Sequence, residues 1–372
     1  MKFDVVIIGG GPAGLSAGFA FIKAGVSVAI IEKDAYPRDK TCAGILTQKA
    51  LSFLNEKIPS LNTEQFFSTK QLTLFFKNEQ TIPIPVKNPF TLVDRKQFDF
   101  ALSNICKESG VHVLEAKKIA TIKLSENVLY LSDGQVITYD FLVAADGVHS
   151  TIRKYLGLQR VPRAFCIQDS IERQFCPDSL ADLQELQLYF GNMALGYSWV
   201  VPNNEYIVIG TGTYVNNFDW SQLQQKHNEL CSKFFPSSIS KRRGAHVPIG
   251  GLISQTDYSN ENIIFIGDAA GLANPLTGEG IYHALLSGFL ASQAYINNPA
   301  KLKTTYLNLL QTTTNNLKEE KRLLSAYYDM LENVFFQFKD YPEYLANICD
   351  EVVSLEQRSY LSLISELKGL FR

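Results

Sequence analysis

The sequence predicts an α/β protein in which a parallel sheet is combined with an antiparallel sheet and a helical C-terminal region. Three observations predict this class. Residues 3–32 have the pattern strand, glycine turn, helix, strand. Residues 139–147 and 261–271 contain further apolar runs, which lead into Asp146-Gly147 and Gly267-Asp268. Residues 71–76 and 81–86 predict a hairpin around residues 77–80, residues 185–190 alternate with a period of two, and residues 206–209 predict a further strand, which together indicate an antiparallel sheet.

The first thirty-two residues are organised as a β-α-β unit. Residues 3–8 are apolar and predict a short buried parallel strand. Residues 15–25 have a helical pattern that closes on Gly25, and residues 26–31 predict the second strand. Glu32 follows directly, where a carboxylate accepts hydrogen bonds from a ribose 2′-hydroxyl, so a ribose 2′-phosphate is disfavoured at this site.

The turn between the first strand and the helix carries G-x-G-x-x-G at Gly9, Gly11 and Gly14. Gly9 permits the tight turn, Gly11 lets the backbone approach a pyrophosphate, and Gly14 allows the helix to pack closely on the strand. The N-terminus of the helix supplies N–H donors and the positive end of its dipole. Strand, glycines, helix, strand and acid in this order predict a dinucleotide site, which at this point is open to either FAD or NAD.

Two later motifs also consist of an apolar strand that ends in glycine and aspartate. Asp146-Gly147 ends an apolar strand, with Ser150 and Arg153 following, and Gly267-Asp268 ends another. Asp268 is placed to accept from a ribityl hydroxyl. The segment 274–281 then places glycines at the start of a helix expected over about 280–294, where N–H groups can face the polar edge of a flavin.

In this order the motifs resemble those of the para-hydroxybenzoate hydroxylase-like flavoproteins, from residue 1 to about 295. Within that superfamily the sequence resembles the geranylgeranyl reductase family. The segment 40–44, Lys-Thr-Cys-Ala-Gly, is similar to the Lys-x-Cys-Gly-Gly stretch beside the isoalloxazine, with Ala43 in place of a glycine. Residues 197–199 and 210–212 are similar to the Tyr-x-Trp…Gly-x-Gly signature of the reductases.

The resemblance implies a Rossmann-like FAD-binding domain of the glutathione reductase/para-hydroxybenzoate hydroxylase type, with an antiparallel substrate sheet and a helical C-terminal region. It also implies which residues line the sites. Cys42, Tyr197 and Trp199 would form the substrate pocket; as alternatives, Cys42 is a small packing residue and the two aromatics belong to the core. The cofactor-binding residues would be Gly9, Gly11, Pro12, Ala13, Gly14, Glu32, Lys33, Cys42, Ala43, Gly44, Arg95, Ile119, Asp146, Gly147, Gly267, Asp268, Pro275, Gly278, Glu279, Gly280 and Ile281.

The expected domain division is discontinuous. Residues 1–70, 91–160 and 255–295 would form the FAD-binding domain. Residues 71–90 and 161–254 would form the substrate-binding sheet domain, and residues 296–372 the C-terminal helical region.

The leading functional hypothesis is reduction of C=C bonds in an isoprenoid or similar apolar substrate, by hydride transfer from flavin N5. No second β-α-β fingerprint is visible, so NAD(P)H would bind transiently, or another protein would supply the electrons. The alternatives are an NAD(P)H-dependent flavin monooxygenase acting on an aromatic or polyketide-like ring, a flavin-dependent halogenase, and a cofactor-free scaffold. Tyr197 counts against the halogenase, because related halogenases have Trp there.

The composition argues against nucleic acid as a partner and predicts a cytoplasmic location. The 372 residues are 46% hydrophobic with a formal net charge of −2, which gives no basic surface for nucleic acid. The six cysteines include no C-x-x-C pair, so we expect reduced thiols, no metal site and a cytoplasmic protein. Neither a signal peptide nor a membrane span is expected. Peripheral membrane contact stays open, for example through the aromatic stretch at 334–338, for which helix packing is the alternative.

Overall fold

In the computed structural model of the chain, the residues described are 1–77, 80–193, 195–214, 219–234, 241–249, 260–322 and 324. They fall into two compact units, each assembled from separate stretches of sequence. The first unit consists of Met1–Asp39, Lys96–Pro162 and Pro248–Lys318, and the second of Lys40–Arg95, Arg163–Val247 and Glu319–Arg372. Neither unit is therefore a continuous half of the chain. The predicted domain bounds, which gave residues 40–70 to the cofactor domain, stay a prediction.

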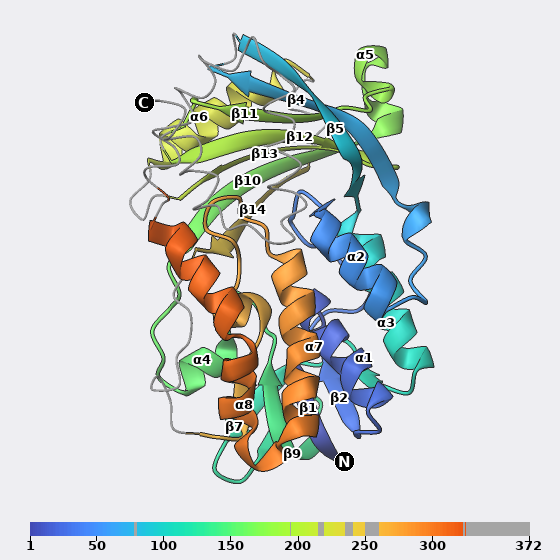
Figure 1. Cartoon of the computed structure of the whole chain (residues 1–372), viewed down its shortest axis with the longest axis vertical. Helices are drawn as coiled ribbons and strands as arrows, with labels where there is room; N and C mark the ends of the chain where they lie inside the picture. Colours follow the sequence, from blue (N-terminus) through green and yellow to red (C-terminus); the bar gives the residue numbers. More distant parts are fainter. Residues whose placement is uncertain are drawn as a thin grey trace. The chain divides into compact units, whose positions relative to one another are not determined.

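The first unit is built on a sheet with a parallel centre (Figure 1). β1 (Lys2–Ile8) pairs in parallel with β2 (Val28–Ile31) on one side and with β9 (Val136–Ala144) on the other. β6 (His112–Leu114) extends the sheet beside β2, and β15 (Ile263–Phe265) pairs in parallel with β9. The carboxyl ends of β1, β2, β9 and β15 therefore lie at one edge of the sheet, where the predicted motifs begin.

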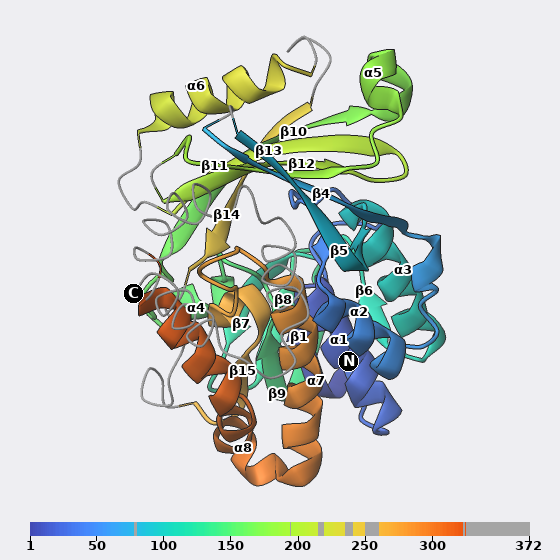
Figure 2. The same cartoon turned by 45° about the horizontal axis from the view of Figure 1, so that its top comes forward.

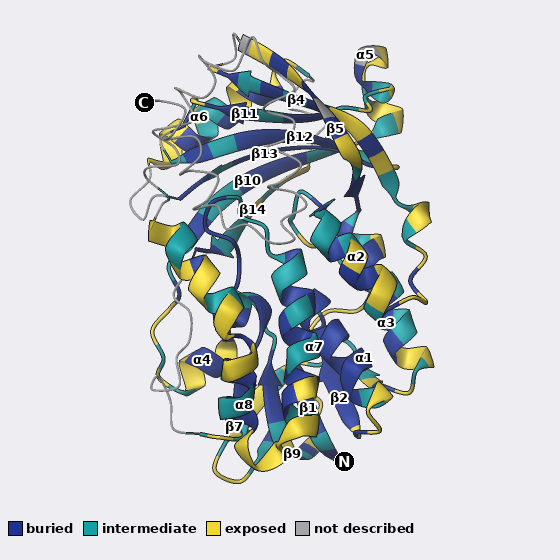
Figure 3. Cartoon of the chain, in the orientation of Figure 1, coloured by how far each residue is buried: buried dark blue, intermediate teal, exposed yellow. Residues whose placement is uncertain are grey.

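Two further strands and several helices complete this unit. β7 (Ile119–Lys123) and β8 (Val128–Leu131) form an antiparallel hairpin that joins β9. The helices with described bounds are α1 (Pro12–Lys23), α3 (Arg95–Glu108, whose first residue belongs to the second unit), α4 (Thr151–Tyr155), α7 (Ile281–Asn297) and α8 (Leu302–Leu309). β2 is buried along its whole length and is dark blue in Figure 3, and β1 is buried from Val5 to Ile8, as expected for central strands covered on both faces.

α1 and α7 approach each other at small residues. A side chain at Gly288 of α7 would overlap the Ala13 carbonyl and lie 2.8 Å from the Ala17 nitrogen of α1. Ser16 of α1 also donates to the Leu285 carbonyl at 2.7 Å. α7, the helix expected over about 280–294, is thus packed on the first turns of α1. This packing brings the glycine turn and the segment 274–281 together.

The second unit contains an eight-stranded sheet in the order β14-β10-β13-β12-β11-β4-β5-β3. Its strands are β3 (Ile45–Leu46), β4 (Phe67–Phe76), β5 (Gln80–Leu92), β10 (Arg163–Glu172), β11 (Leu186–Phe190), β12 (Gly196–Pro202), β13 (Tyr206–Thr213) and β14 (Lys241–Pro248). Figure 2 shows α6 (Trp220–Cys231) lying along one face of this sheet. Short helices α2 (Gln48–Lys57) and α5 (Asp178–Ala181) complete the unit.

The fold class predicted from the sequence is confirmed in both sheets, with one difference in pairing. The expected hairpin forms from β4 and β5; its turn residues 78–79 lie outside the described residues. The neighbouring pair β11 and β4 is parallel, so the sheet is mixed instead of wholly antiparallel. The reason is connectivity, because more than a hundred residues separate these strands and no hairpin turn dictates their direction.

The C-terminal helical prediction is covered only in its first part. α8 is followed by helical residues 311–322, while the predicted stretch from 325 onwards, with the aromatic segment 334–338, lies outside the described residues. Among the described helices, none combines the length and apolar character needed to span a membrane.

Candidate functional site

The glycine turn after β1 has a geometry that only glycine satisfies at two positions. Gly9 has a φ of +105°, and a side chain there would overlap the Ala145 carbonyl oxygen. A side chain at Gly14 would overlap the Gly9 carbonyl oxygen. Gly9 therefore brings the turn against the end of β9, and Gly14 lets α1 lie directly on the turn.

Gly11 differs from Gly9 and Gly14, because a side chain at Gly11 would meet no atom of the described residues within 4 Å. Gly11 is the N-cap of α1 and has no side-chain cap, and Pro12 occupies the first turn. The N–H groups at the start of α1 are therefore not satisfied by a side chain. Open space above an uncapped helix N-terminus suits a phosphate group, so these residues fit the pyrophosphate of a dinucleotide.

The later motifs of the first unit meet this turn. Gly267 has a φ of +55°, and a side chain there would lie 2.8 Å from the Cβ of Ala13. Arg153, which is buried, donates from Nη1 to the Ala269 carbonyl at 3.2 Å. The structure thus brings together the glycine turn, the segment after β9 and the segment after β15, although more than a hundred residues separate the first two of these.

Asp146 and Glu279 both act on helix starts. Asp146 Oδ2 accepts from the Thr151 and Ile152 nitrogens at 2.6 and 3.2 Å, at the start of α4. Burial raises the pKa of Asp146, although its hydrogen bonds oppose that shift. Glu279 Oε1 accepts from the Tyr282 nitrogen at 2.7 Å, at the start of α7. These carboxylates stabilise helix starts within the segments that were predicted to hold the cofactor.

Glu32 is buried at the end of β2 and is already hydrogen-bonded within the protein. Its Oε2 accepts from the Gly10 nitrogen at 2.8 Å, and its Oε1 accepts from the Asp34 nitrogen at 3.1 Å. Arg38 Nη2 lies 3.5 Å from Oε2. A carboxylate has about four acceptor positions, so room remains for a ribose hydroxyl. The sequence reasoning missed Arg38, whose only signal was its place in the segment that precedes Cys42.

The remaining predicted residues of the first unit are distributed along it. Gly280 lies at the start of α7, and a side chain there would be 3.5 Å from Asp268 Oδ1. Pro275 is buried in the turn between them. Lys33 is exposed just after β2, and Ile119 is half-buried at the start of β7. Their contact with a cofactor stays a prediction.

In the second unit, the segment around Cys42 is tied to the end of β5. Gly44 has a φ of +78°, its carbonyl accepts from the Val93 nitrogen at 2.8 Å, and a side chain would overlap the Val93 carbonyl. Cys42 Sγ lies 3.4 Å from the Gly44 nitrogen, which donates to it. Cys42 and Ala43 are half-buried, whereas Arg95 is buried at the first position of α3.

Tyr197 and Trp199 lie on one face of β12, and their rings are 5.5 Å apart. Ala43 and Tyr197 both pack against the apolar cluster that contains Trp199. The Trp199 ring covers Gly210 of the neighbouring strand, where any side chain would overlap it. The signature glycine is therefore needed because it makes room for the indole, and the structure brings the two resemblance segments of this unit onto one cluster.

Cys166 of β10 packs against the same apolar cluster as Tyr197 and Ala43. A side chain at Gly212 would lie 3.4 Å from the Cβ of Cys166 and 3.5 Å from Trp199. Burial raises the pKa of Cys166 to about 12, and the proximity of Cys42 adds to the rise. Cys166 is therefore a protonated thiol at neutral pH, as expected for a packing residue.

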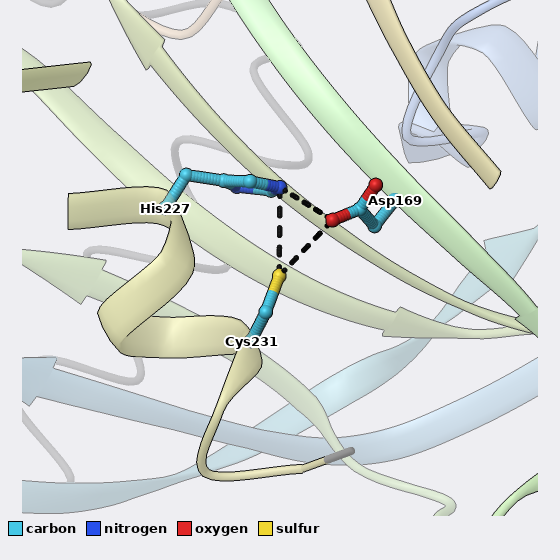
Figure 4. A group of neighbouring side chains, drawn as sticks. All are labelled: Asp169, His227 and Cys231. Carbon is cyan, nitrogen blue, oxygen red and sulfur yellow. Dashed lines mark hydrogen bonds and ion pairs between the residues drawn. The ribbon is translucent and has the colours of Figure 1, made fainter. Parts of the chain in front are cut away.

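A polar cluster that the sequence reasoning missed lies on the α6 side of this sheet (Figure 4). Asp169 of β10 accepts at Oδ2 from His227 Nε2 at 3.1 Å and from Cys231 Sγ at 3.4 Å. All three residues are buried. The signal in the sequence was the spacing of His227 and Cys231, four residues apart and therefore on one helix face.

Neighbouring groups complete this cluster as an ion-pair network. Arg242 Nη2 donates to the same Asp169 oxygen at 2.7 Å, and His227 Nδ1 lies 3.1 Å from Thr211 Oγ1. Burial alone would raise the pKa of Asp169, but the hydrogen bonds from His227 and Arg242 outweigh burial and hold it below its usual range. Burial raises the pKa of Cys231 to about 12.

These ligand-type atoms also have the spacing of a small metal site, but their charges argue against one. Asp169 and Arg242 already neutralise each other, so a divalent cation bound by a Cys231 thiolate would leave a net positive charge in a buried place. We therefore interpret the cluster as a network that holds α6 on the sheet.

Comparison with known proteins agrees with this geometry. The model of the FAD binding domain family matches residues 2–287. The digeranylgeranylglycerophospholipid reductase of Methanocaldococcus jannaschii is 28% identical over 364 residues, which cover 88% of this chain and 84% of that protein. The geranylgeranyl diphosphate reductase of Rhodobacter capsulatus is 24% identical over 364 residues, covering 95% and 89%. The crystal structure of a geranylgeranyl bacteriochlorophyll reductase-like protein from Thermoplasma acidophilum has a TM-score of 0.75 at 19% identity and covers 99% of both chains, a likeness of fold.

Proposed function

The chain belongs to the FAD binding domain family and is an FAD-dependent oxidoreductase of the geranylgeranyl reductase type; on that premise, we propose that it reduces C=C bonds of an isoprenoid or similarly apolar substrate. The observation that carries the proposal is the apolar cluster of the second unit, in which the partly buried Ala43 and Tyr197 pack against residues that include the buried Trp199. Two relatives named as reductases of geranylgeranyl compounds support it.

The protein holds the cofactor mainly through its backbone. Gly11 and the first turn of α1 bind the pyrophosphate, because they combine open space with uncapped N–H groups. Glu32 accepts a hydrogen bond from the adenosine ribose. Asp268 accepts one from the ribityl chain. When bound, FAD supplies the hydride for one carbon of the double bond, and a proton completes the other carbon.

The substrate residues orient an apolar chain and exclude water. Tyr197 and Trp199 supply two aromatic rings, tilted by 54° to each other, against which an apolar isoprenoid chain packs. Cys42 helps to position the substrate and takes no part as a nucleophile. The electrons for bound FAD would come from NAD(P)H binding transiently or from a protein electron donor.

The test is an anaerobic assay of the flavin-loaded enzyme with geranylgeranyl diphosphate and a chemical reductant. The expected product gains one pair of hydrogen atoms for each double bond reduced, measured by mass spectrometry. A product that forms only with oxygen, and that carries an oxygen atom from isotopically labelled dioxygen, would refute the proposal and favour the monooxygenase.

Substrate delivery requires contact with a membrane surface if the substrate is a lipid, so the proposal extends to peripheral membrane association. Co-sedimentation with phospholipid vesicles that contain the isoprenoid lipid tests this extension. Enzyme that stays in the supernatant at every lipid concentration would refute it, without affecting the reductase assignment.

A further inference from the structure

Gly10 lies between Gly9 and Gly11 in the turn. Both its N–H and its carbonyl are hydrogen-bonded to side chains of one short segment. The Gly10 nitrogen donates to Glu32 Oε2 at 2.8 Å. The Gly10 carbonyl accepts from Arg38 Nη2 at 2.9 Å and also from the Tyr36 hydroxyl. The three partners lie within residues 32–38, which follow β2. The orientation of the turn is therefore set by this segment as well as by its own glycines.

Gly10 is fitted closely to these partners. A side chain at Gly10 would overlap the Tyr36 hydroxyl and lie 3.1 Å from Glu32 Oε2. Burial raises the pKa of Tyr36 far above its usual range, so its hydroxyl is protonated at neutral pH and donates to the Gly10 carbonyl. The Arg38 guanidinium lies 5.2 Å from the Tyr36 ring, which fixes the two side chains against each other.

Arg38 links this turn to a second buried carboxylate. Its Nη1 lies 3.2 Å from Asp99 Oδ2 in α3, and its Nη2 lies 3.5 Å from Glu32 Oε2. The Asp99 side chain is 0% exposed, and that of Arg38 is 10% exposed. One guanidinium therefore sits between two buried carboxylates and holds both in place.

We infer that Arg38 is a positioning residue for the adenosine half of FAD. It holds the Gly10 carbonyl and the Glu32 carboxylate in one arrangement, so that the turn presents its N–H groups to the pyrophosphate while Glu32 faces the ribose 2′-hydroxyl. Arg38 acts through Gly10 and Glu32. This inference depends on FAD as the cofactor and is independent of the substrate proposed above.

The test measures FAD affinity of the full-length apoprotein by quenching of flavin fluorescence. Arg38→Met should weaken FAD binding by about tenfold to a hundredfold, because charge-assisted hydrogen bonds are lost. Arg38→Lys should recover part of the affinity. Lys23→Met, an exposed change at the end of α1, is the matched control and should leave affinity within about twofold.

A second measurement separates positioning from simple loss of fold. Arg38→Met leaves Asp99 and Glu32 buried without their shared counter-ion. The double variant Arg38→Met/Asp99→Asn also removes the charge of Asp99, while Glu32 keeps its hydrogen bonds from the Gly10 and Asp34 nitrogens. We expect the double variant to recover the apoprotein melting temperature but not the FAD affinity. Recovery of wild-type affinity in the double variant would overturn the inference.

A third readout tests the route through Glu32. Wild-type protein should bind FAD more tightly than an analogue that lacks the adenosine 2′-hydroxyl, and this preference should shrink in the double variant. An undiminished preference would also overturn the inference. Tyr36→Phe, which removes only the hydroxyl donor to Gly10, should weaken FAD binding several-fold with little change in apoprotein melting.

Discussion

The buried network of Asp169, His227 and Arg242 makes a prediction about stability. Asp169→Asn keeps the shape of the side chain and removes its charge. In the wild type, Asp169 accepts from His227 at 3.1 Å and from Arg242 at 2.7 Å. A hydrogen bond to a charged group contributes about 1.5–3 kcal/mol and a neutral one about 1 kcal/mol. Two weakened bonds therefore cost about 1–4 kcal/mol.

The exposure of Arg242 determines how much unfolding free energy is lost in Asp169→Asn. Its side chain is 35% exposed, so water can rehydrate the guanidinium when its partner is neutralised. We therefore expect Asp169→Asn to lower the free energy of unfolding by about 2 kcal/mol at pH 7. Urea unfolding followed by circular dichroism measures the loss. Glu229→Gln, at an exposed ion pair on the same helix, is the matched control and should cost less than about 0.5 kcal/mol.

The pH dependence supplies an independent check. Because hydrogen bonds hold the pKa of Asp169 below its usual range in the folded state, its contribution is present above the unfolded pKa of about 3.9 and is lost as pH falls through the folded pKa. The difference between wild type and Asp169→Asn should stay constant from about pH 8 to 5 and close below about pH 4.

Two results would refute this reasoning. A loss at pH 7 no larger than that of Glu229→Gln would show that the network contributes nothing beyond a surface ion pair. A wild-type unfolding midpoint that drops on addition of a chelator would show that the cluster binds a metal ion, which the Asp169–Arg242 pair argues against.

Three further predictions concern the cofactor turn and the substrate sheet. Gly11→Leu should abolish FAD retention and leave the melting temperature of the apoprotein unchanged, because the space above Gly11 is open. Gly14→Ala should lower that melting temperature, because a side chain there would overlap the Gly9 carbonyl oxygen. Equal melting temperatures of the two variants would contradict this geometry. Cys42→Ser should change turnover and leave the FAD content, read from flavin absorbance, intact; loss of fold would instead favour a packing role. Gly210→Ala should displace the Trp199 indole and lower turnover, and unaltered tryptophan fluorescence would count against it.

The β-α-β unit and its glycine turn were predictable because their requirements are local. Gly9 needs a positive φ, and Gly14 must clear the carbonyl five residues earlier. Both constraints act within a few residues, so they leave a readable pattern. The Tyr197-x-Trp199 pair was found by resemblance, and the structure adds that Gly210 accommodates the Trp199 ring.

The parallel pairing of β11 with β4 and the Asp169 network could not be read in the same way. Asp169, His227 and Arg242 lie on three elements, and any one of them alone in the sequence has the character of an ordinary polar residue. Likewise, Arg38 becomes informative only when Gly10, Glu32 and Asp99 are seen around it.

The amino-acid sequence by itself therefore determined the class of fold and the turn that receives a dinucleotide, because strand periodicity and glycine conformation depend on near neighbours. Only the tertiary structure decided which buried charges pair and which strands run parallel. Those outcomes depend on burial and on contacts between distant residues, since a charge is stabilised by whichever partner the fold brings within hydrogen-bond distance.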